Sequence, residues 1–485
     1  MNFPDRLVAL ILALCFALAG PSDVIAEGSV LQLTYSAVTT TVDWDADAQK
    51  TVTDTIDSEV DVWLAENRFA IRIGSSTFIY DLRAERLIVA DSDLLERIEF
   101  PLFTDVAFRV LEMQNRIWIH RGLQNVGLSK RDPSEIRGLH DLETLFGLPW
   151  PHAVDDLPGG ELAVLQPKPG YWQFQIDGEP ESKAVSSQTQ RPLLPEHRDA
   201  YLKWLLYSMR MHPSLWDALS QGVASPLQEI QLNSRDGFQQ QRKTYRLERF
   251  NESATWPVEI KTIPRVFRLQ FPNPAPHNDF AVWAERIAAA PDGDGLPPRP
   301  TEAEAQAAAE AALEAGHPLD AFLALIGFGL QEGVRFDDQI RRLVAEHGND
   351  PQFASYLAIA RRDDEQADDP AGPNAYERML AIDRTGLKHA HVLDIFTANE
   401  ALAVGEVEAA CRHFAAALEV NPHITGVWHD LAGLARESYD TFTAWACFDI
   451  ARQLRRDHPM LQRLDSFEDR LRDDFPRFFM TTRDQ

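Results

Sequence analysis

Hydrophobic and polar residues alternate along the first part of the chain, from about residue 30 to residue 90. Val60, Val62 and Leu64 are separated by single residues, and the same period recurs over residues 69–73 and 78–82. Turn-forming residues separate these short runs, which is typical of β-strands. Because the runs follow one another too closely for crossover helices, we predict an antiparallel meander with one buried face.

A helical period follows. Phe103, Val106, Ala107, Val110 and Leu111 share one face of a helix, which we expect to cover the open face of the sheet.

The next part of the chain mixes both periods. Residues 116–120 read as a return to strand, and residues 139–148 as a short helix. The remaining expected elements are strands at 171–176, 227–232, 243–250 and 266–271, and a helix at 196–211. We interpret residues 27–271 as one β-rich domain, with a separate domain after residue 126 as the alternative.

Seven prolines lie between residues 272 and 300, so this stretch is the predicted interdomain linker, with one short helix at 279–290. From Thr301 onward every predicted element is helical. Thr301 and Glu304 have the spacing of a capping box at the start of the first helix.

The C-terminal part contains one pattern twice, at a fixed interval. The matched pairs are Ala398 and Ala432, Ala410 and Ala444, Phe414 and Phe448, and Ala417 and Ala451. A constant period of about 34 residues predicts stacked pairs of helices. Fainter copies begin near Glu302 and Phe353. We therefore expect three or four pairs over residues 301–485, because a lone pair cannot bury both of its faces.

The second copy adds Trp428 and Leu431 ahead of Ala432, and this arrangement resembles the tetratricopeptide repeat (TPR) family. The resemblance implies an α-solenoid that binds partners along the first helix of each pair. Carried over by repeat position, the polar members of that groove are Arg361, Asn399, His429 and Arg436. Asn399 matches the family's carboxylate clamp. Ile395 and Asp430 replace other clamp residues, which favours an extended peptide or a helix as the partner.

The β-rich part, with Ile79-Tyr80-Asp81-Leu82, resembles the half-barrel of LolA-like periplasmic lipoprotein carriers over residues 28–125. The fold class that follows is a multidomain α+β protein. It would have an antiparallel half-barrel-like domain with covering helices and a C-terminal TPR-like solenoid. The resemblance implies an apolar ligand but assigns no binding residue.

The N-terminus carries an export signal in our interpretation. Arg6 precedes an apolar run over residues 7–19, and Ala26 fits a cleavage site, so residues 1–26 would be a signal peptide. Thirteen apolar residues fall short of the ~20 that cross a bilayer. We expect a periplasmic or secreted protein that does not span the membrane. We expect Cys411 and Cys447 to be buried thiols, with a disulfide between them as the alternative.

The chain carries a formal net charge of -27, which repels phosphate backbones and argues against a nucleic-acid partner. No nucleophile elbow, metalloprotease motif or phosphate loop is present, so we expect no cofactor and favour a non-catalytic protein. A hydrolase with an unrecognised site remains a third hypothesis.

Two groups have metal-like spacing. Asp43, Asp45, Asp47 and Asp54 follow the ligand spacing of an EF-hand, but Ala48 stands where that loop needs glycine. We interpret them as an exposed acidic hairpin tip and keep calcium as the alternative. His389 and His391 would point about 200° apart on a helix, so we expect no shared metal there. The leading function is a cell-envelope adaptor that binds a protein segment, and the alternative is a carrier of a lipid or other apolar ligand.

Overall fold

The computed structural model describes residues 29–45, 50–125, 133–149, 163–168, 170–176, 179–186, 192–236, 239–271, 280–291, 295–361 and 373–480. The predicted signal peptide, residue Asp47 and residues 272–279 of the predicted linker lie outside these ranges.

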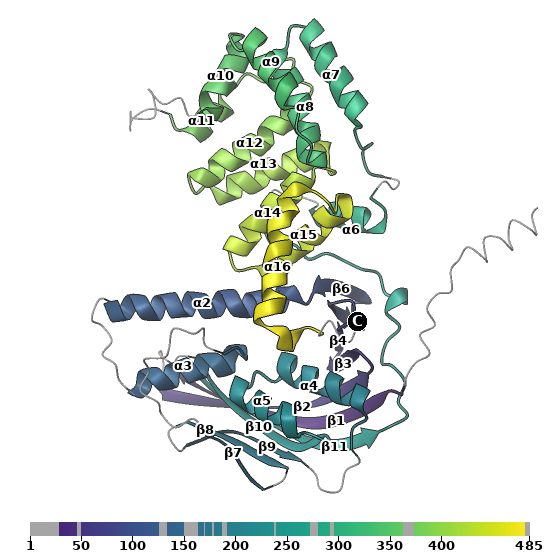
Figure 1. Ribbon diagram of the computed structural model, residues 1–485, viewed down its shortest axis with the longest axis vertical. Helices are drawn as coiled ribbons and strands as arrows, with labels where there is room; N and C mark the ends of the chain where they lie inside the picture. Colours follow the sequence, from purple (N-terminus) through teal and green to yellow (C-terminus); the bar gives the residue numbers. More distant parts are fainter. Residues whose placement is uncertain are drawn as a thin grey trace, which may run out of the picture. The chain divides into compact units, whose positions relative to one another are not determined.

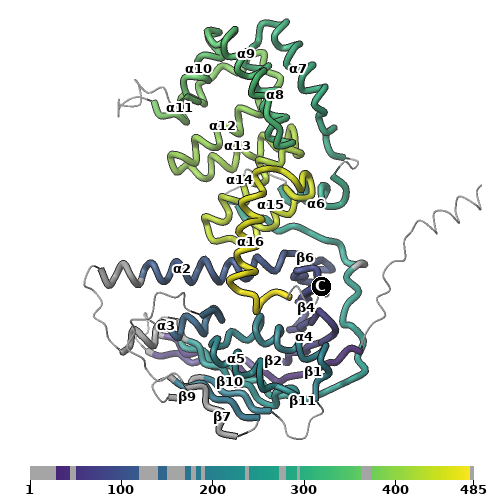
Figure 2. Tube along the Cα trace, viewed as in Figure 1, coloured from purple at the N-terminus to yellow at the C-terminus, as the bar shows by residue number. Residues whose placement is uncertain are grey.

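The chain divides into two compact units that are not consecutive in sequence (Figures 1 and 2). The first unit contains the residues up to Thr77 and Ile136–Glu259. The second contains Phe78–Glu135 and all residues from Ile260 onward. Each unit has its own core.

An open antiparallel sheet forms the centre of the first unit. In spatial order its strands are β3 (Arg68–Ile73), β2 (Lys50–Ala65), β1 (Leu31–Asp45), β11 (Gln239–Asn251), β10 (Leu227–Asp236), β9 (Glu179–Ser186), β8 (Tyr171–Ile176) and β7 (Ala163–Lys168). Strands β1 and β11 pair antiparallel, with Gln32 opposite Asn251. The middle of the chain therefore completes the sheet that the N-terminal strands begin.

The alternating pattern buries one face of this sheet. Leu33 and Tyr35 on β1 and Val62 and Leu64 on β2 are all fully buried. Two helices cover this region: α4 (Pro195–Ser208) packs against β2 and β3, and α5 (Pro213–Gly222) against β7 and β8. A further helix, α3 (Pro133–Phe146), belongs to this unit from Ile136 onward.

A pair of buried tyrosines joins α4 to the sheet. The hydroxyl groups of Tyr35 and Tyr201 lie 3.3 Å apart, and the backbone N–H of Leu227 donates to the Tyr201 hydroxyl at 2.9 Å. Burial is the largest cause of the raised pKa of both phenols, which therefore stay neutral hydrogen-bonding groups.

The second unit begins with β4 (Ser76–Asp81), β5 (Arg86–Asp91), β6 (Glu96–Pro101) and α2 (Phe103–Asn125). Its other helices are α6 (Phe280–Ala289), α7 (Glu302–Glu314), α8 (Pro318–Glu332), α9 (Asp337–His347), α10 (Pro351–Ala360), α11 (Ala375–Leu380), α12 (Ala390–Ala403), α13 (Val407–Val420), α14 (Thr425–Glu437), α15 (Thr441–Leu454) and α16 (Gln462–Asp474). Helix α2 packs against α15 and α16. No helix within the described ranges combines the length and apolar character that a membrane crossing requires.

One local signal was predicted correctly at the start of helix α7. The capping box at Thr301 is confirmed: its hydroxyl accepts from the backbone of Glu304 at 3.3 Å, and the Glu304 carboxylate accepts from the backbone of Thr301 at 2.8 Å. The α+β class is likewise confirmed, with the antiparallel sheet in the N-terminal part and helices in the C-terminal part.

Two predicted strands are wrong. Residues 116–120 continue helix α2, because Ile117 extends the buried stripe of Val106, Val110 and Met113. Trp118 is left 72% exposed.

Residues 266–271 form no strand, because beyond Val266, whose N–H donates to the carbonyl oxygen of Arg97, two backbone donors of this segment bond to helix side chains. The N–H of Phe267 donates to Glu285 at 3.4 Å, and that of Gln270 to Thr443 at 3.0 Å. A single parallel bridge between Arg97 and Arg265 is the only ladder contact made by this part of the described chain.

Candidate functional site

Two helix hairpins, α12–α13 and α14–α15, repeat at the interval that the sequence pattern predicts. The N–H of Glu406 donates to the carbonyl oxygen of Ala401 at 2.8 Å, and the equivalent bond from Asp440 to Ala435 is 2.9 Å. Such a bond caps the C-terminus of a helix. Its donor is the residue that follows one with a left-handed backbone conformation. The two hairpins therefore share equivalent backbone hydrogen bonds as well as equivalent residues.

The residue before each donor has the same left-handed backbone. Gly405 has φ 82° and Tyr439, at the equivalent position of the next hairpin, has φ 60°. Hairpin α7–α8 uses the same turn, with Gly316 at φ 78° and the N–H of His317 bonded to Ala312 at 2.9 Å. The backbone of Tyr439 is strained in this left-handed conformation, because its Cβ atom comes close to the carbonyl oxygen that follows.

Small residues line the interior of both clear hairpins. The four pairs that carry the sequence pattern are all at most 2% exposed: Ala398 and Ala432, Ala410 and Ala444, Phe414 and Phe448, and Ala417 and Ala451. Alanine lets the two helices of a hairpin approach closely, and the phenylalanine fills the space beside them. Cys411 and Cys447 lie in the same interior as buried free thiols, and burial raises the pKa of Cys411 to about 11.

The predicted groove residues lie on three helices. Asn399 on α12 and Arg436 on α14 are exposed, as is Arg361 at the C-terminal end of α10. Within the described chain none of these three side chains has a hydrogen-bond or ion-pair partner. His429 on α14 is half-buried, with Nδ1 3.2 Å from a carboxylate oxygen of Asp430.

Helix α8 covers the N-terminal halves of α12 and α14. A Cβ atom on Gly327 of α8 would lie 2.8 Å from the side chain of Val392, and one on Gly426 of α14 would lie 3.2 Å from the carbonyl oxygen of Leu330. Val392 and Gly426 occupy the same position of their respective repeats. One surface of α8 therefore contacts equivalent positions of both repeats, and the exposed residues of α12 and α14 all lie in the C-terminal halves of these helices.

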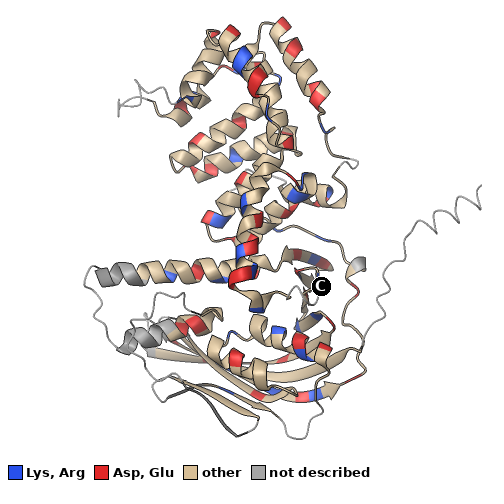
Figure 3. Ribbon diagram, viewed as in Figure 1, with Lys and Arg blue, Asp and Glu red and all other residues tan. Residues whose placement is uncertain are grey.

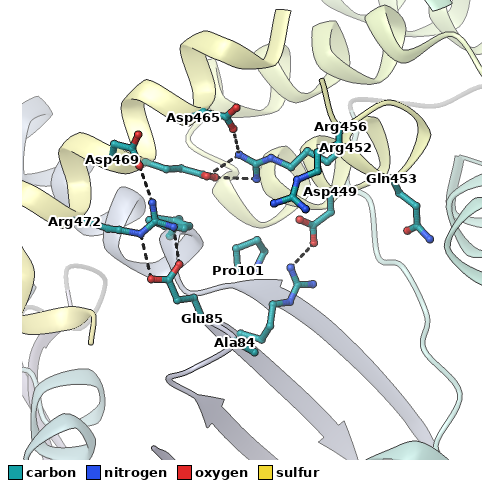
Figure 4. Close-up of a pocket in the computed structure, with 13 residues that line it drawn as sticks. Ala84, Glu85, Pro101, Asp449, Arg452, Gln453, Arg456, Asp465, Asp469 and Arg472 are labelled. Carbon is teal, nitrogen blue, oxygen red and sulfur yellow. Dashed lines mark hydrogen bonds and ion pairs between the residues drawn. The ribbon is translucent and has the colours of Figure 1, made fainter. Parts of the chain in front are cut away.

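A charged pocket of about 570 Å³ lies elsewhere in the second unit, among the β4–β5 turn, β5, β6, α2, α15 and α16 (Figure 4). Arg86 pairs with Asp449 at 2.7 Å, and Arg472 makes a two-pronged contact with Glu85 at 2.7 and 3.1 Å. Figure 3 shows acidic and basic residues close together on α16.

The lining contains four arginines and five carboxylates. Since the paired charges cancel, an anionic ligand has little to gain there. The pocket is better explained as an ion-pair clamp that holds the strands against the two helices.

Glu468 is the buried centre of this clamp, with 5% of its surface exposed. Its two carboxylate oxygens accept from Arg452 at 3.1 and 2.6 Å, and Trp445 Nε1 donates to it at 2.9 Å. Burial raises the pKa of Glu468, against the opposing effect of Arg452. In this buried environment, Glu468 or Arg452 would each destabilise the fold if it were charged without its partner.

The two predicted metal-like groups differ in their surroundings. Asp43 on β1 and Asp54 on β2 point to the same face, because Thr41 is the ladder partner of Asp54. The strands continue to Asp45 and Lys50, so a β-ladder runs through most of the acidic segment.

His389, the N-cap of α12, and His391 lie close together, and both are near Asp320. Nδ1 of His389 lies 3.1 Å from Asp320, and the ring centroids of the two histidines are 6.2 Å apart. Burial lowers the pKa of His391 to about 4.

Sequence reasoning missed one group of possible metal ligands. His140, Glu143 and His212 of the first unit bring three donor atoms within 4.8 Å of one another. The spacing of His140 and Glu143 on one helix face was the available signal, but His212 is far away in sequence.

Comparison with known proteins gives no assignment: no family model matches the chain, and no curated protein matches it.

Removing one partner of the buried pair should be costly. We expect Arg452→Met to lower the free energy of unfolding by about 3 kcal/mol at pH 7, because Glu468 is left charged and unpaired. The loss should shrink at pH 5. A carboxyl whose folded-state pKa lies above its unfolded value takes up a proton more readily when folded, so acidification relieves the penalty. Urea denaturation at both pH values measures this.

Arg456→Met is the matched control, since Arg456 is exposed and has no partner in the described chain. It should change the unfolding free energy by less than about 0.5 kcal/mol. Equal losses for the two variants, or a pH-independent loss for Arg452→Met, would contradict the clamp.

Proposed function

We propose that this protein is a non-catalytic adaptor of the cell envelope that binds a segment of a partner protein. The binding surface consists of the exposed residues in the C-terminal halves of α12 and α14, Asn399 and Arg436 among them. The observation that supports the proposal is the regular repetition of the two hairpins. On the first helix of each hairpin, an exposed polar side chain (Asn399 or Arg436) has no hydrogen-bond or ion-pair partner within the described chain. A TPR-like solenoid uses this part of each repeat for recognition.

The chemistry of the surface favours a partner with hydrogen-bonding and acidic groups. Arg436 is a cation without an ion-pair partner in the described chain, and the amide of Asn399 can both donate and accept. Helix α8 already occupies the other half of the repeat surface, so the partner segment is short. Arg361 follows the last residue of α10, and half-buried His429 lies in the N-terminal half of α14, so both are only secondary contacts in this proposal.

Site-specific photocrosslinking tests the surface in the intact protein. A benzoylphenylalanine placed at Asn399 or at Arg436 should crosslink one discrete protein in cells, and that protein should belong to the envelope because the chain is proposed to be exported. The same group at Glu419, an exposed residue of α13, is the control and should give no such product. Identical products from all three positions, or a cytoplasmic partner, would contradict the adaptor.

A second candidate function is a carrier of an anionic apolar ligand in the first unit. A cavity of about 220 Å³ is lined by Leu145, Met209, Arg210, Leu232, Ser234, Gln241 and Lys243. Leu232 is opposite Lys243 and Ser234 opposite Gln241 in the β10–β11 ladder, so these four line one face of the sheet.

Two cations in this cavity favour an anion. Burial lowers the pKa of Lys243, and the charge of Arg210 lowers it further. Neither cation has an ion-pair partner in the described chain. Since pockets that enclose a drug-sized ligand usually exceed about 300 Å³, this one would hold a head group and the start of an acyl chain.

Native mass spectrometry tests the carrier. The protein should retain an acidic lipid or fatty acid, and Lys243→Gln should reduce its occupancy at least about fivefold, a modest free-energy loss for one ionic contact. Arg242→Gln is the control, because Arg242 is exposed on the opposite face of the same strand and bonds to Asn233. A ligand-free wild-type protein, or equal retention by both variants, would contradict the carrier.

A further inference from the structure

Three side chains that do not line the cavity converge in the first unit. His140 and Glu143 are three residues apart on α3 and therefore lie on one helix face. His212, at the N-cap of α5, approaches them from another part of the chain. Nδ1 of His140 and Nε2 of His212 each lie 2.8 Å from the same carboxylate oxygen of Glu143, and the two nitrogens are 3.4 Å apart.

These distances fit metal coordination. Zinc binds imidazole nitrogen and carboxylate oxygen at about 2.0–2.2 Å, and a triangle with sides of 2.8, 2.8 and 3.4 Å is small enough for one point to lie at that distance from all three atoms. The geometry points to a site for a divalent transition-metal ion of the zinc type, held by His140, Glu143 and His212. Three protein ligands leave a coordination position for water or a further group.

The surroundings hold these ligands in place. His212 is 3% exposed, and its ring stacks on Phe174 with centroids 4.1 Å apart.

The same contacts also describe a simple hydrogen-bonded cluster, in which both rings donate to Glu143. In that state Nδ1 of His212 accepts from the backbone N–H of Ser214 at 3.1 Å, so the ring proton is on Nε2. Metal binding through Nε2 moves that proton to Nδ1 and removes this one capping bond of α5, a small loss beside three metal–ligand bonds. The two states therefore differ in a measurable way.

Metal titration of the purified full-length protein decides between them. After chelator treatment, equilibrium dialysis against Zn²⁺ should show one tightly bound ion per chain, and Zn²⁺ should raise the melting temperature. Glu143→Gln, which keeps a hydrogen-bond acceptor, and His140→Ala should each weaken binding at least about 10-fold, because loss of a partner that merely orients a metal ligand already costs about that much. Circular dichroism without metal checks that both variants fold.

His347→Ala is the control, because the side chain of His347 is 41% exposed on α9 of the other unit. It should bind zinc as the wild type does. The metal site is overturned if the wild type binds no stoichiometric ion, or if Glu143→Gln and His140→Ala retain wild-type affinity while folded.

Discussion

The packing of helix α8 against the first helices of both clear repeats is the constraint on which the helical unit depends. Most of the residues of α8 are buried, and it contacts α7, α9, α10, α12 and α14. Close approach is possible because Gly327 and Gly426 have no side chain at the two contacts with Val392 and Leu330. A helix this apolar must be covered on every side, so the neighbouring helices are arranged around it.

In the proposed adaptor, this packing also limits the part of the repeats that a partner could reach. In a free repeat pair the whole first helix is available to a partner, whereas here α8 occupies the N-terminal half in both copies. Asn399 and Arg436 remain exposed beyond it. A buried polar network at the C-terminal end of α8 fixes its position further: Gln331 donates to the carbonyl oxygen of Pro300 at 3.0 Å and accepts from Asn421 at 3.1 Å. The end of the predicted linker is therefore part of the helical unit.

The sequence predicted what is local or periodic. Alternation identified the strands from β2 to β5, and the matched alanines and phenylalanines identified the two hairpins, because each pattern is set by neighbouring residues in one element. Residues 116–120 were misread since Ile117 and Ile119 fit both a strand and the end of a helix.

Features that join distant segments were not predictable. The clamp brings Glu85 to Arg472, and the His140 and Glu143 pair meets His212, through contacts that no single-sequence period records. The packing of α8 against the repeats was equally unpredictable. Gly327 indicates that another segment approaches α8 closely, but it does not indicate which segment.

The most direct measurement of the central claim is the stability of two matched variants, Gly327→Ala and Gly433→Ala, by urea denaturation. Both replace a helical glycine, but a Cβ at Gly433 would have no atom within 4 Å. We predict that Gly433→Ala raises the unfolding free energy by about 1 kcal/mol. Gly327→Ala should lower it by about 1–3 kcal/mol, because the new methyl group overlaps Val392. An equal gain for both variants would show that α8 does not pack closely against the repeats, and the account would fail.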